Sequence, residues 1–207
     1  MAIIECPECT ASVSDRANGC IKCGFPLEEH LAEQVEIEAA DKFSAALGDH
    51  PDLSIGKQVT NWGGNASIKV DADFDHGELG ALEPGAVQIL GHQAGLKLIN
   101  SIWKIDDYYD ISFKQIVEIK QIPAEDFVHE EKSVIGRGII GGILLGGSAA
   151  VVGALSGLDK SKLKKFMVTE LYFYDPGIHR IRGIIFRSDR MVSTACPSSD
   201  NLRHMAG

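Results

Sequence analysis

The chain has 207 residues, which is enough for one ordinary domain with an appendage and too few for two large domains. Hydrophobic residues make up 44% of the sequence, as in globular proteins, and the formal net charge is -9. Because phosphate groups are bound by clustered positive charge, this balance argues against a nucleic-acid partner.

Four cysteines stand near the amino terminus in two Cys-x-x-Cys pairs, Cys6 with Cys9 and Cys20 with Cys23. Two residues between cysteines allow one tight turn to direct both thiolates at a single ion. A second such turn completes a tetrahedral shell of four sulfurs that leaves no position open for water. We therefore predict a structural Zn²⁺ site, whose metal stabilises a segment too short to bury a sufficient core.

Other chemistries use the same spacing: disulfides, a redox pair, or iron held as in rubredoxin-like proteins. Because no secretory signal precedes Cys6, we expect a reducing cytoplasm, where thiolates are free for metal. Cys-Pro-x-Cys followed by Cys-x-x-Cys-Gly resembles the small zinc-ribbon modules that open many bacterial multidomain proteins. The resemblance covers about residues 3–27, although Thr10 stands where these modules usually have glycine. We expect residues 1–27 to form a zinc ribbon, and the fifth cysteine, Cys196, to serve in packing.

The next segment, residues 28–50, is predicted to be an acidic helical linker. This prediction is based on the apolar residues that recur at every fourth position between residues 27 and 47, namely Leu27, Leu31, Val35, Ala39, Phe43 and Leu47. Acidic side chains occupy the other faces, and Gly48 and Pro51 stop the helix. We expect a solvated linker helix that docks on the following domain, with a partner-binding or coiled-coil helix as the alternative.

Residues 51–207 are predicted to form a β domain. Polar and apolar residues alternate over residues 67–74, which predicts a strand. The turn at Gly63-Gly64-Asn65 predicts that this strand forms a hairpin with residues 56–62. Further strands are expected over residues 86–91, 95–100, 109–122 and 127–134. The clearest strands are residues 166–174 and 178–186, joined by the turn residues Asp175-Pro176-Gly177 into an antiparallel hairpin.

In this hairpin, Arg180 and Arg182 alternate with Ile181 and Ile185, which predicts a half-buried second strand. Residues 198–205 are expected to form a short closing helix. Together the elements predict an α+β, mostly β fold: a zinc ribbon, a linker helix, and an antiparallel, partly open barrel with a helix at its carboxyl end.

Three runs, residues 111–120, 131–142 and 166–186, resemble bacterial pleckstrin-homology-like domains, which are relatives of the GRAM type. Some of these domains also carry a glycine-rich insertion before their last hairpin. The resemblance extends over about residues 85–205. It implies a scaffold that binds lipids, peptides or a second copy of itself, without a catalytic site.

The insertion, residues 134–158, has no charge from residue 138 onward. Small residues recur in it at a spacing typical of closely packed helices, and basic residues flank it. The small residues include Gly138, Gly142, Gly146, Gly153 and Gly157, and the basic flank comprises Arg137, Lys160, Lys162, Lys164 and Lys165. A single span would divide one sheet between two compartments, so we favour a helical hairpin packed within or between subunits. A hairpin dipping into one leaflet and a true span are the alternatives.

No enzyme motif is present. The phosphate-loop pattern and His-Glu-x-x-His are absent, and the seven histidines are scattered. Asp71, Asp73, Asp75 and His76 are the best candidate for metal or acid-base chemistry outside the ribbon, although such a run is more typical of a solvated strand. We expect a non-enzymatic, cytoplasmic zinc-binding adaptor that binds protein partners or self-associates. The alternative is a protein at the inner face of the membrane, inserted through the glycine-rich segment and contacting anionic lipid.

Overall fold

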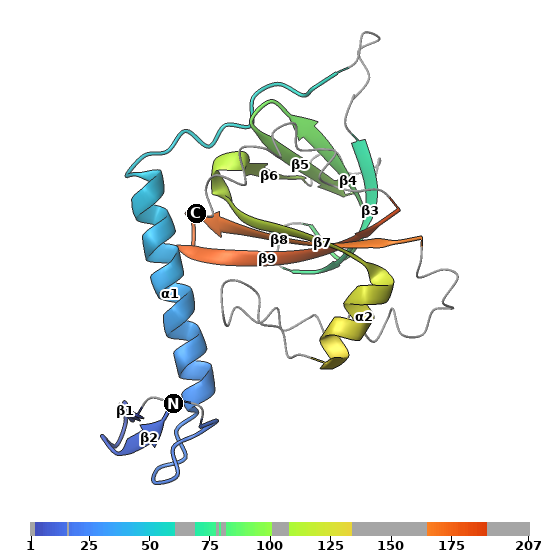
Figure 1. The fold of residues 1–207 in the computed structure, drawn as a ribbon. Helices are drawn as coiled ribbons and strands as arrows, with labels where there is room; N and C mark the ends of the chain where they lie inside the picture. The colour runs from blue at the N-terminus through green and yellow to red at the C-terminus, as the bar shows by residue number, and fades with distance from the viewer. Residues whose placement is uncertain are drawn as a thin grey trace.

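The computed structural model describes residues 3–15, 17–60, 69–77, 79, 82–100, 108–133 and 165–189. Figure 1 shows a small amino-terminal unit, a long helix and a curved sheet with a second helix beneath it. The elements in chain order are β1 (Ile3–Glu5), β2 (Ser12–Ser14), α1 (Leu27–Leu47), β3 (Lys69–His76), β4 (Gly85–His92), β5 (Gly95–Asn100), β6 (Tyr108–Ser112), the 3-10 turn η1 (Phe113–Gln115), β7 (Ile116–Pro123), α2 (Ala124–Ser133), β8 (Met167–Asp175) and β9 (Arg180–Ser188).

The main sheet has seven strands in the order β6-β5-β4-β3-β9-β8-β7, and every neighbouring pair is antiparallel. The sheet curls but does not close, because β6 and β7 stand at its two ends. This confirms the prediction of a mostly β, antiparallel, partly open barrel.

Side chains from the concave face of the sheet fill the barrel interior. Alternating residues of each strand point inward, as the two-residue period of a strand requires. Aromatic rings form the centre, with Phe74 and Phe186 5.7 Å apart between ring centroids. The buried cluster also includes Val70, Val87, Ile89, Leu96, Leu98, Ile111, Leu171, Phe173 and Ile184. Burial of this apolar surface is the main source of the barrel's stability.

The sequence predicted one solvated face for the second strand of the β8–β9 hairpin. Most of the hairpin is instead buried on both faces, although Arg180 at the start of β9 is exposed. The inward residues of the hairpin, such as Phe173 and Ile184, belong to the barrel interior. On the outer face, Ile181 packs in a cluster with α1, and Ile185 packs in a cluster with α2. The predicted hairpin itself is confirmed, and its strands pair from Met167↔Ser188 to Asp175↔Arg180.

Residues 127–133 are helical, and the prediction of a strand there was wrong. Glu125 and Asp126 occupy the first turn of α2, where carboxylates interact favourably with the unpaired amide groups of a helix. Phe127 and Val128 give the helix one apolar side, which packs on Val168 and Ile185. The segment is rich in the helix formers Ala, Glu and Lys, so its local preference agrees with the observed structure.

The segment before β3 does not form the predicted hairpin with residues 67–74. Its described part lies against the β4–β5 turn: the Val59 amide donates to the Gly91 carbonyl at 3.0 Å, and the Ala94 amide donates to the Ile55 carbonyl at 2.9 Å. Strand β3 instead lies between β4 and β9. Both edges of β3 are therefore already paired with other strands.

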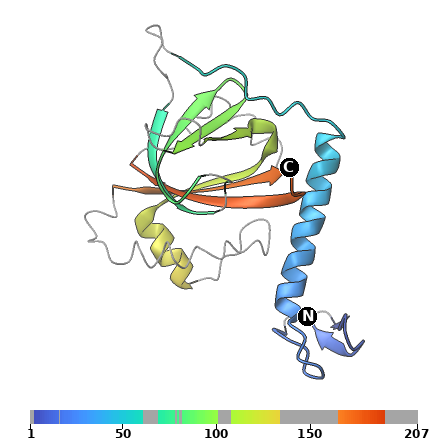
Figure 2. The same ribbon diagram turned by 180° about the vertical axis from the view of Figure 1, so that it is seen from behind.

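Helix α1 spans Leu27–Leu47, as the four-residue apolar spacing predicts. It ends at Gly48, which adopts φ 80° and donates its amide to the Ser44 carbonyl at 3.1 Å. Figures 1 and 2 show α1 beside the barrel with the amino-terminal unit at its far end. Its carboxyl-terminal half docks on the outer face of β8 and β9, so the expectation of a docked linker helix is met.

The glycine-rich insertion over residues 134–158, Cys196 and the predicted closing helix over residues 198–205 lie outside the described residues. Among the helices that the structure does describe, none combines the length and the apolar character needed to cross a bilayer.

Candidate metal centre

Two turns of similar geometry carry the four cysteines. Strand β1 pairs with β2 in the register Ile3↔Ser14, Ile4↔Val13 and Glu5↔Ser12. This hairpin presents the first turn, in which the Thr10 amide donates to the Cys6 carbonyl at 2.9 Å. In the second turn the Gly24 amide donates to the Cys20 carbonyl at 2.8 Å. Each turn therefore closes over five residues, and the sulfurs of its two cysteines lie within 4.8 Å of each other.

A left-handed residue follows each Cys-x-x-Cys pair. Gly24 has φ 79°, which costs a glycine little. Thr10, which follows the first pair as Gly24 follows the second, has φ 57° and takes the same left-handed conformation despite its side chain. Its hydroxyl donates to the Cys9 carbonyl at 2.8 Å, a local hydrogen bond that helps to hold the turn. The departure from glycine at Thr10 therefore does not change the geometry of the site.

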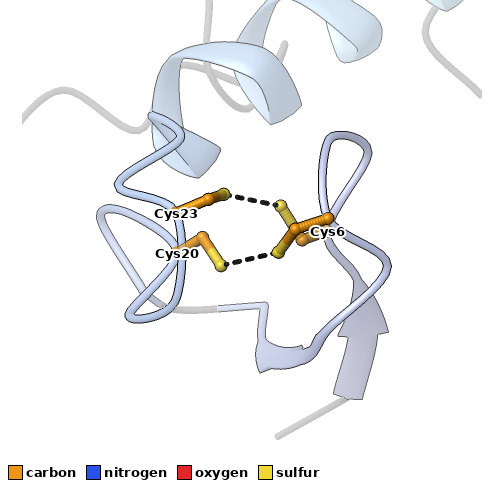
Figure 3. Close-up of side chains that lie close together, drawn as sticks. Cys6, Cys20 and Cys23 are labelled. Carbon is orange, nitrogen blue, oxygen red and sulfur yellow. Dashed lines mark hydrogen bonds between the residues drawn. The ribbon is translucent and has the colours of Figure 1, made fainter.

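The sulfurs of Cys6, Cys20 and Cys23 face one another between the two turns (Figure 3). Cys6 Sγ lies 3.6 Å from Cys23 Sγ, and Cys9 Sγ lies 3.5 Å from Cys20 Sγ. All four sulfurs lie within 4.8 Å of one another. Sulfurs around a tetrahedral Zn²⁺ ion are separated by about 3.8 Å, given a Zn–S distance of about 2.3 Å. The observed spacing fits one tetrahedral ion.

The same distances exclude disulfides in this structure. A disulfide bond joins two sulfurs at about 2.05 Å, so the cysteines here are four free thiols. These two sulfur contacts, at 3.5 and 3.6 Å, each join a cysteine of one turn to a cysteine of the other. A redox pair of the Cys-x-x-Cys type would join the two cysteines of one turn.

The sulfurs form part of the core of the amino-terminal unit. Cys6 and Cys20 are buried, Cys9 is half-buried and Cys23 is exposed. Ala11, Val13 and Leu27 complete the buried cluster. Leu27 is 0% exposed and is also the first residue of α1, so the helix begins inside the core of the amino-terminal unit.

The thiols differ in their readiness to bind metal. The pKa of Cys20 is lowered to about 6 because the backbone amides of Cys23 and Lys22 donate to its sulfur. The pKa of Cys23 is raised to about 12: the Phe25 amide lowers it, but desolvation and the neighbouring thiols outweigh that effect. Since the thiolate is the metal ligand, the lowered pKa of Cys20 favours its metal-binding form at neutral pH.

The donor set determines which ions the site can hold. Four thiolates in a tetrahedral arrangement suit zinc, and they also suit a single iron ion. All four positions around such an ion are taken by protein sulfur, so no position remains for a substrate or a water nucleophile. This arrangement fits a structural metal centre.

The acidic residues of β3 form a different arrangement. The Arg187 guanidinium donates to Asp73 Oδ2 at 3.4 Å and to Asp75 Oδ1 at 3.1 Å. Desolvation raises the pKa of Asp75, and Arg187 opposes that rise. A hollow of about 430 Å³ lies beside this cluster and is lined in part by Asp71, Phe166 and Asp189. Within the described part of the chain, the four cysteines are the grouping of His, Cys, Asp and Glu suited to hold a metal.

The sequence did not predict a hydrogen-bonded relay between α1 and the β8–β9 turn. Tyr174 Oη lies 2.7 Å from His179 Nδ1, and His179 Nε2 lies 2.8 Å from Asp41 Oδ1. An ion pair between Arg180 and Glu33, at 3.8 Å, extends the contact along the helix. In the sequence, His179 stands beside a turn and Asp41 stands on an acidic helix, and neither position by itself indicates a contact between the two residues.

Most of the other predicted site residues fall outside the described residues. These are Gly138, Gly142, Gly146, Gly153, Gly157, Arg137, Lys160, Lys162 and Lys164. Lys165 is described, and it lies exposed just before β8.

Comparisons with known proteins leave the site to be interpreted from its own geometry. No family model, no curated protein and no solved structure matches this chain.

Proposed function

We propose that this protein is a non-catalytic adaptor, in which a structural zinc ribbon is carried on a helix by a pleckstrin-homology-like barrel that binds a protein partner or a second copy of the chain. The observation that carries this proposal is the closed set of four thiols. A site whose four positions are all filled by sulfur stabilises a fold and offers no position for catalysis.

The barrel supports a role in binding at surfaces. Its interior is filled by a continuous cluster of apolar side chains, including Phe74, Phe173 and Phe186. An interior packed in this way leaves recognition to the outer faces and edges of the sheet. The likeness to pleckstrin-homology-like domains is part of the proposal and rests on the order of strands and on the sequence of the insertion.

The ribbon supports protein contact. Ile21, between the two cysteines of the second turn, is 92% exposed, and Ile3 is 77% exposed. The sequence up to residue 27 carries three acidic residues, Glu5, Glu8 and Asp15, against two basic residues, Arg16 and Lys22. Exposed apolar side chains beside carboxylates suit a protein surface better than a nucleic-acid backbone.

Metal analysis tests the zinc ribbon directly. We expect one zinc ion per chain in protein purified under reductant, and loss of order in residues 3–27 after chelation. Cys6→Ser removes a ligand and should abolish stoichiometric binding, whereas Cys196→Ser is the matched control and should retain the ion. Iron in place of zinc would change the metal assigned. Protein without metal, and equally ordered after chelation, would contradict the proposal.

Light scattering and flotation test the binding role. We expect a mass greater than one chain, which Gly142→Leu combined with Gly146→Leu reduces because leucine blocks close helix packing. Flotation with anionic vesicles addresses the alternative of membrane association. Flotation that is lost on deletion of residues 138–158 would replace the adaptor with a membrane-associated protein.

A further inference from the structure

The outer face of the β8–β9 hairpin forms an apolar seat for a helix. Tyr172, Tyr174 and Ile181 provide its buried floor, and Val117 of β7 packs at its side. Helix α1 lies on this floor through Ala40, which is 0% exposed, together with Ala39, Phe43 and Leu47. The rings of Phe43 and Tyr174 are 5.8 Å apart between centroids.

The seat restricts the residue at the centre of the helix. Because Ala40 is fully buried against tyrosine and isoleucine side chains, its Cβ already fills the available space. A longer side chain there would push the helix away from the sheet. The seat therefore accepts a helix with a small residue at this position, an aromatic residue three positions later and a leucine seven positions later.

A polar relay at the end of the hairpin selects a carboxylate on the helix. When the His179 imidazole is neutral, Tyr174 donates its hydroxyl proton to Nδ1, and Nε2 donates its proton to Asp41 Oδ1. Tyr174 thus fixes the tautomer of His179 that needs an acceptor on the helix. Glu33, eight residues before Asp41, meets Arg180 in the same manner. A helix without these carboxylates would leave His179 and Arg180 without their partners on α1.

The contact between α1 and the β8–β9 hairpin has the features of a reversible contact. The side chains of Asp41, His179, Glu33 and Arg180 are 52% to 63% exposed, and exposed ion pairs of this kind stabilise weakly. The first half of α1 extends past the barrel toward the ribbon, as Figures 1 and 2 show. Val35 and Ile37 in that half are exposed. A small apolar contact with an exposed polar rim holds this helix to the barrel.

We propose that the outer face of the β8–β9 hairpin is a helix-binding site, which α1 of the same chain occupies, and that His179 selects the occupant through the carboxylate at position 41. The inference rests on the proposed binding function and assigns a surface to it. A free helix with the pattern of α1 is the chemical class of ligand that this site would take.

A labelled peptide of residues 27–48 tests the site in the full-length, zinc-loaded protein. Ala40→Arg in the protein displaces its own helix and opens the seat. We expect this variant to bind the peptide in fluorescence anisotropy, and a peptide carrying the same Ala40→Arg change not to bind. Absence of binding to the opened protein would overturn the proposal.

The role of His179 is tested by a double-mutant cycle on the opened protein. A peptide carrying Asp41→Ala should bind about two- to fivefold more weakly than the natural peptide, the range expected when one exposed hydrogen bond to a carboxylate is lost. Adding His179→Asn to the protein should remove this difference, because asparagine tolerates the left-handed φ of 53° but does not reproduce the relay. A peptide carrying Lys42→Ala is the control and should bind as the natural peptide does. An Asp41 effect that persists without His179 would overturn the assigned selection.

Hydrogen exchange provides a second measurement, made on the full-length protein with α1 in its place and without an added peptide. Asp41→Ala should raise amide exchange in residues 39–47 relative to the natural protein, while Glu38→Gln should not. Equal exchange in all three proteins would contradict the proposal. Zinc content is expected to stay unchanged in each variant, so failure here is distinguishable from failure of the zinc ribbon.

Discussion

Gly95 of β5 packs so closely on Ile55 that a Cβ at position 95 would overlap the Ile55 side chain and the carbonyl of Ile111. Ile55 belongs to the segment that follows α1, and the Ala94 amide holds it on the barrel by donating to its carbonyl. The absence of a side chain at Gly95 therefore allows this segment to cover the β4–β5 turn.

Gly95→Ala should lower the free energy of unfolding by about 1–3 kcal/mol, the range typical of an extra group forced into a packed core. Urea denaturation followed by far-UV circular dichroism measures the change. Adding Ile55→Ala should recover part of the loss due to Gly95→Ala, since one of the two overlapping groups is then removed. Full additivity of the two substitutions would contradict the proposed overlap.

Phe127→Ala should destabilise the barrel by about 3–5 kcal/mol, because it empties a space under α2 that the ring fills completely. Phe127 is 1% exposed and packs with Val168 and Ile185 on the outer face of the hairpin. Chemical denaturation measures the loss, and Glu125→Gln in the same helix is the control with a small expected effect. A loss of stability no larger than that caused by Glu125→Gln would contradict this prediction, because it would show that α2 is not needed to cover this face.

Arg187→Met should destabilise the protein at neutral pH by about 2–4 kcal/mol, because Asp75, whose side chain is only 16% exposed, then loses its cationic partner. Buried Asp75 Oδ2 and Arg187 Nε have no hydrogen-bond partner, which adds to the cost of this cluster.

The Arg187→Met loss should shrink as the pH falls. The pKa of Asp75 is raised by desolvation in the folded state, so folding favours its protonated form. The stability that this group contributes is full below its unfolded pKa and is lost as the pH rises through the higher folded pKa. Unfolding midpoints measured from pH 4 to pH 7 check the direction. A loss that grows on acidification would contradict the assignment.

Zinc binding should release fewer protons from Cys20, whose pKa is about 6, than from Cys9 and Cys23, whose pKa values are raised. At pH 7.5 the Cys20 thiol is already ionised, whereas Cys9 and Cys23 must lose protons before they bind. Calorimetry in buffers of different ionisation enthalpy counts these protons. Below pH 6 the Cys20 thiol also takes up a proton, so zinc affinity should fall more steeply there.

The features visible in the sequence are those with a local cause. The spacing of Cys6, Cys9, Cys20 and Cys23 predicted the convergence of four sulfurs, because each pair is closed by one short turn. The apolar period of α1 and the turn at Asp175 predicted the helix and the last hairpin for the same reason. In that turn Asp175 Oδ1 accepts from the Gly177 amide at 2.9 Å.

The features that the sequence did not show depend on distant residues. His179 and Asp41 are 138 positions apart, and neither residue carries a local pattern that indicates the other. Residues 127–134 were expected to be a strand because Phe127 and Val128 favour β structure alone. The helix formers around them and the acidic first turn outweigh that preference. The hairpin expected at Gly63 was wrong because β9, from the end of the described chain, takes the free edge of β3.

Because the β8–β9 hairpin is covered on both faces, its strands should tolerate few amino-acid substitutions. Ile181, Ile184 and Ile185 of β9 each belong to a different buried cluster. A substitution along these strands must therefore suit the barrel interior, the floor beneath one helix, or the floor beneath the other. Random mutagenesis with selection for folded protein should leave the buried residues of β8 and β9 nearly unaltered, while substitutions accumulate on the solvent-facing side of α1.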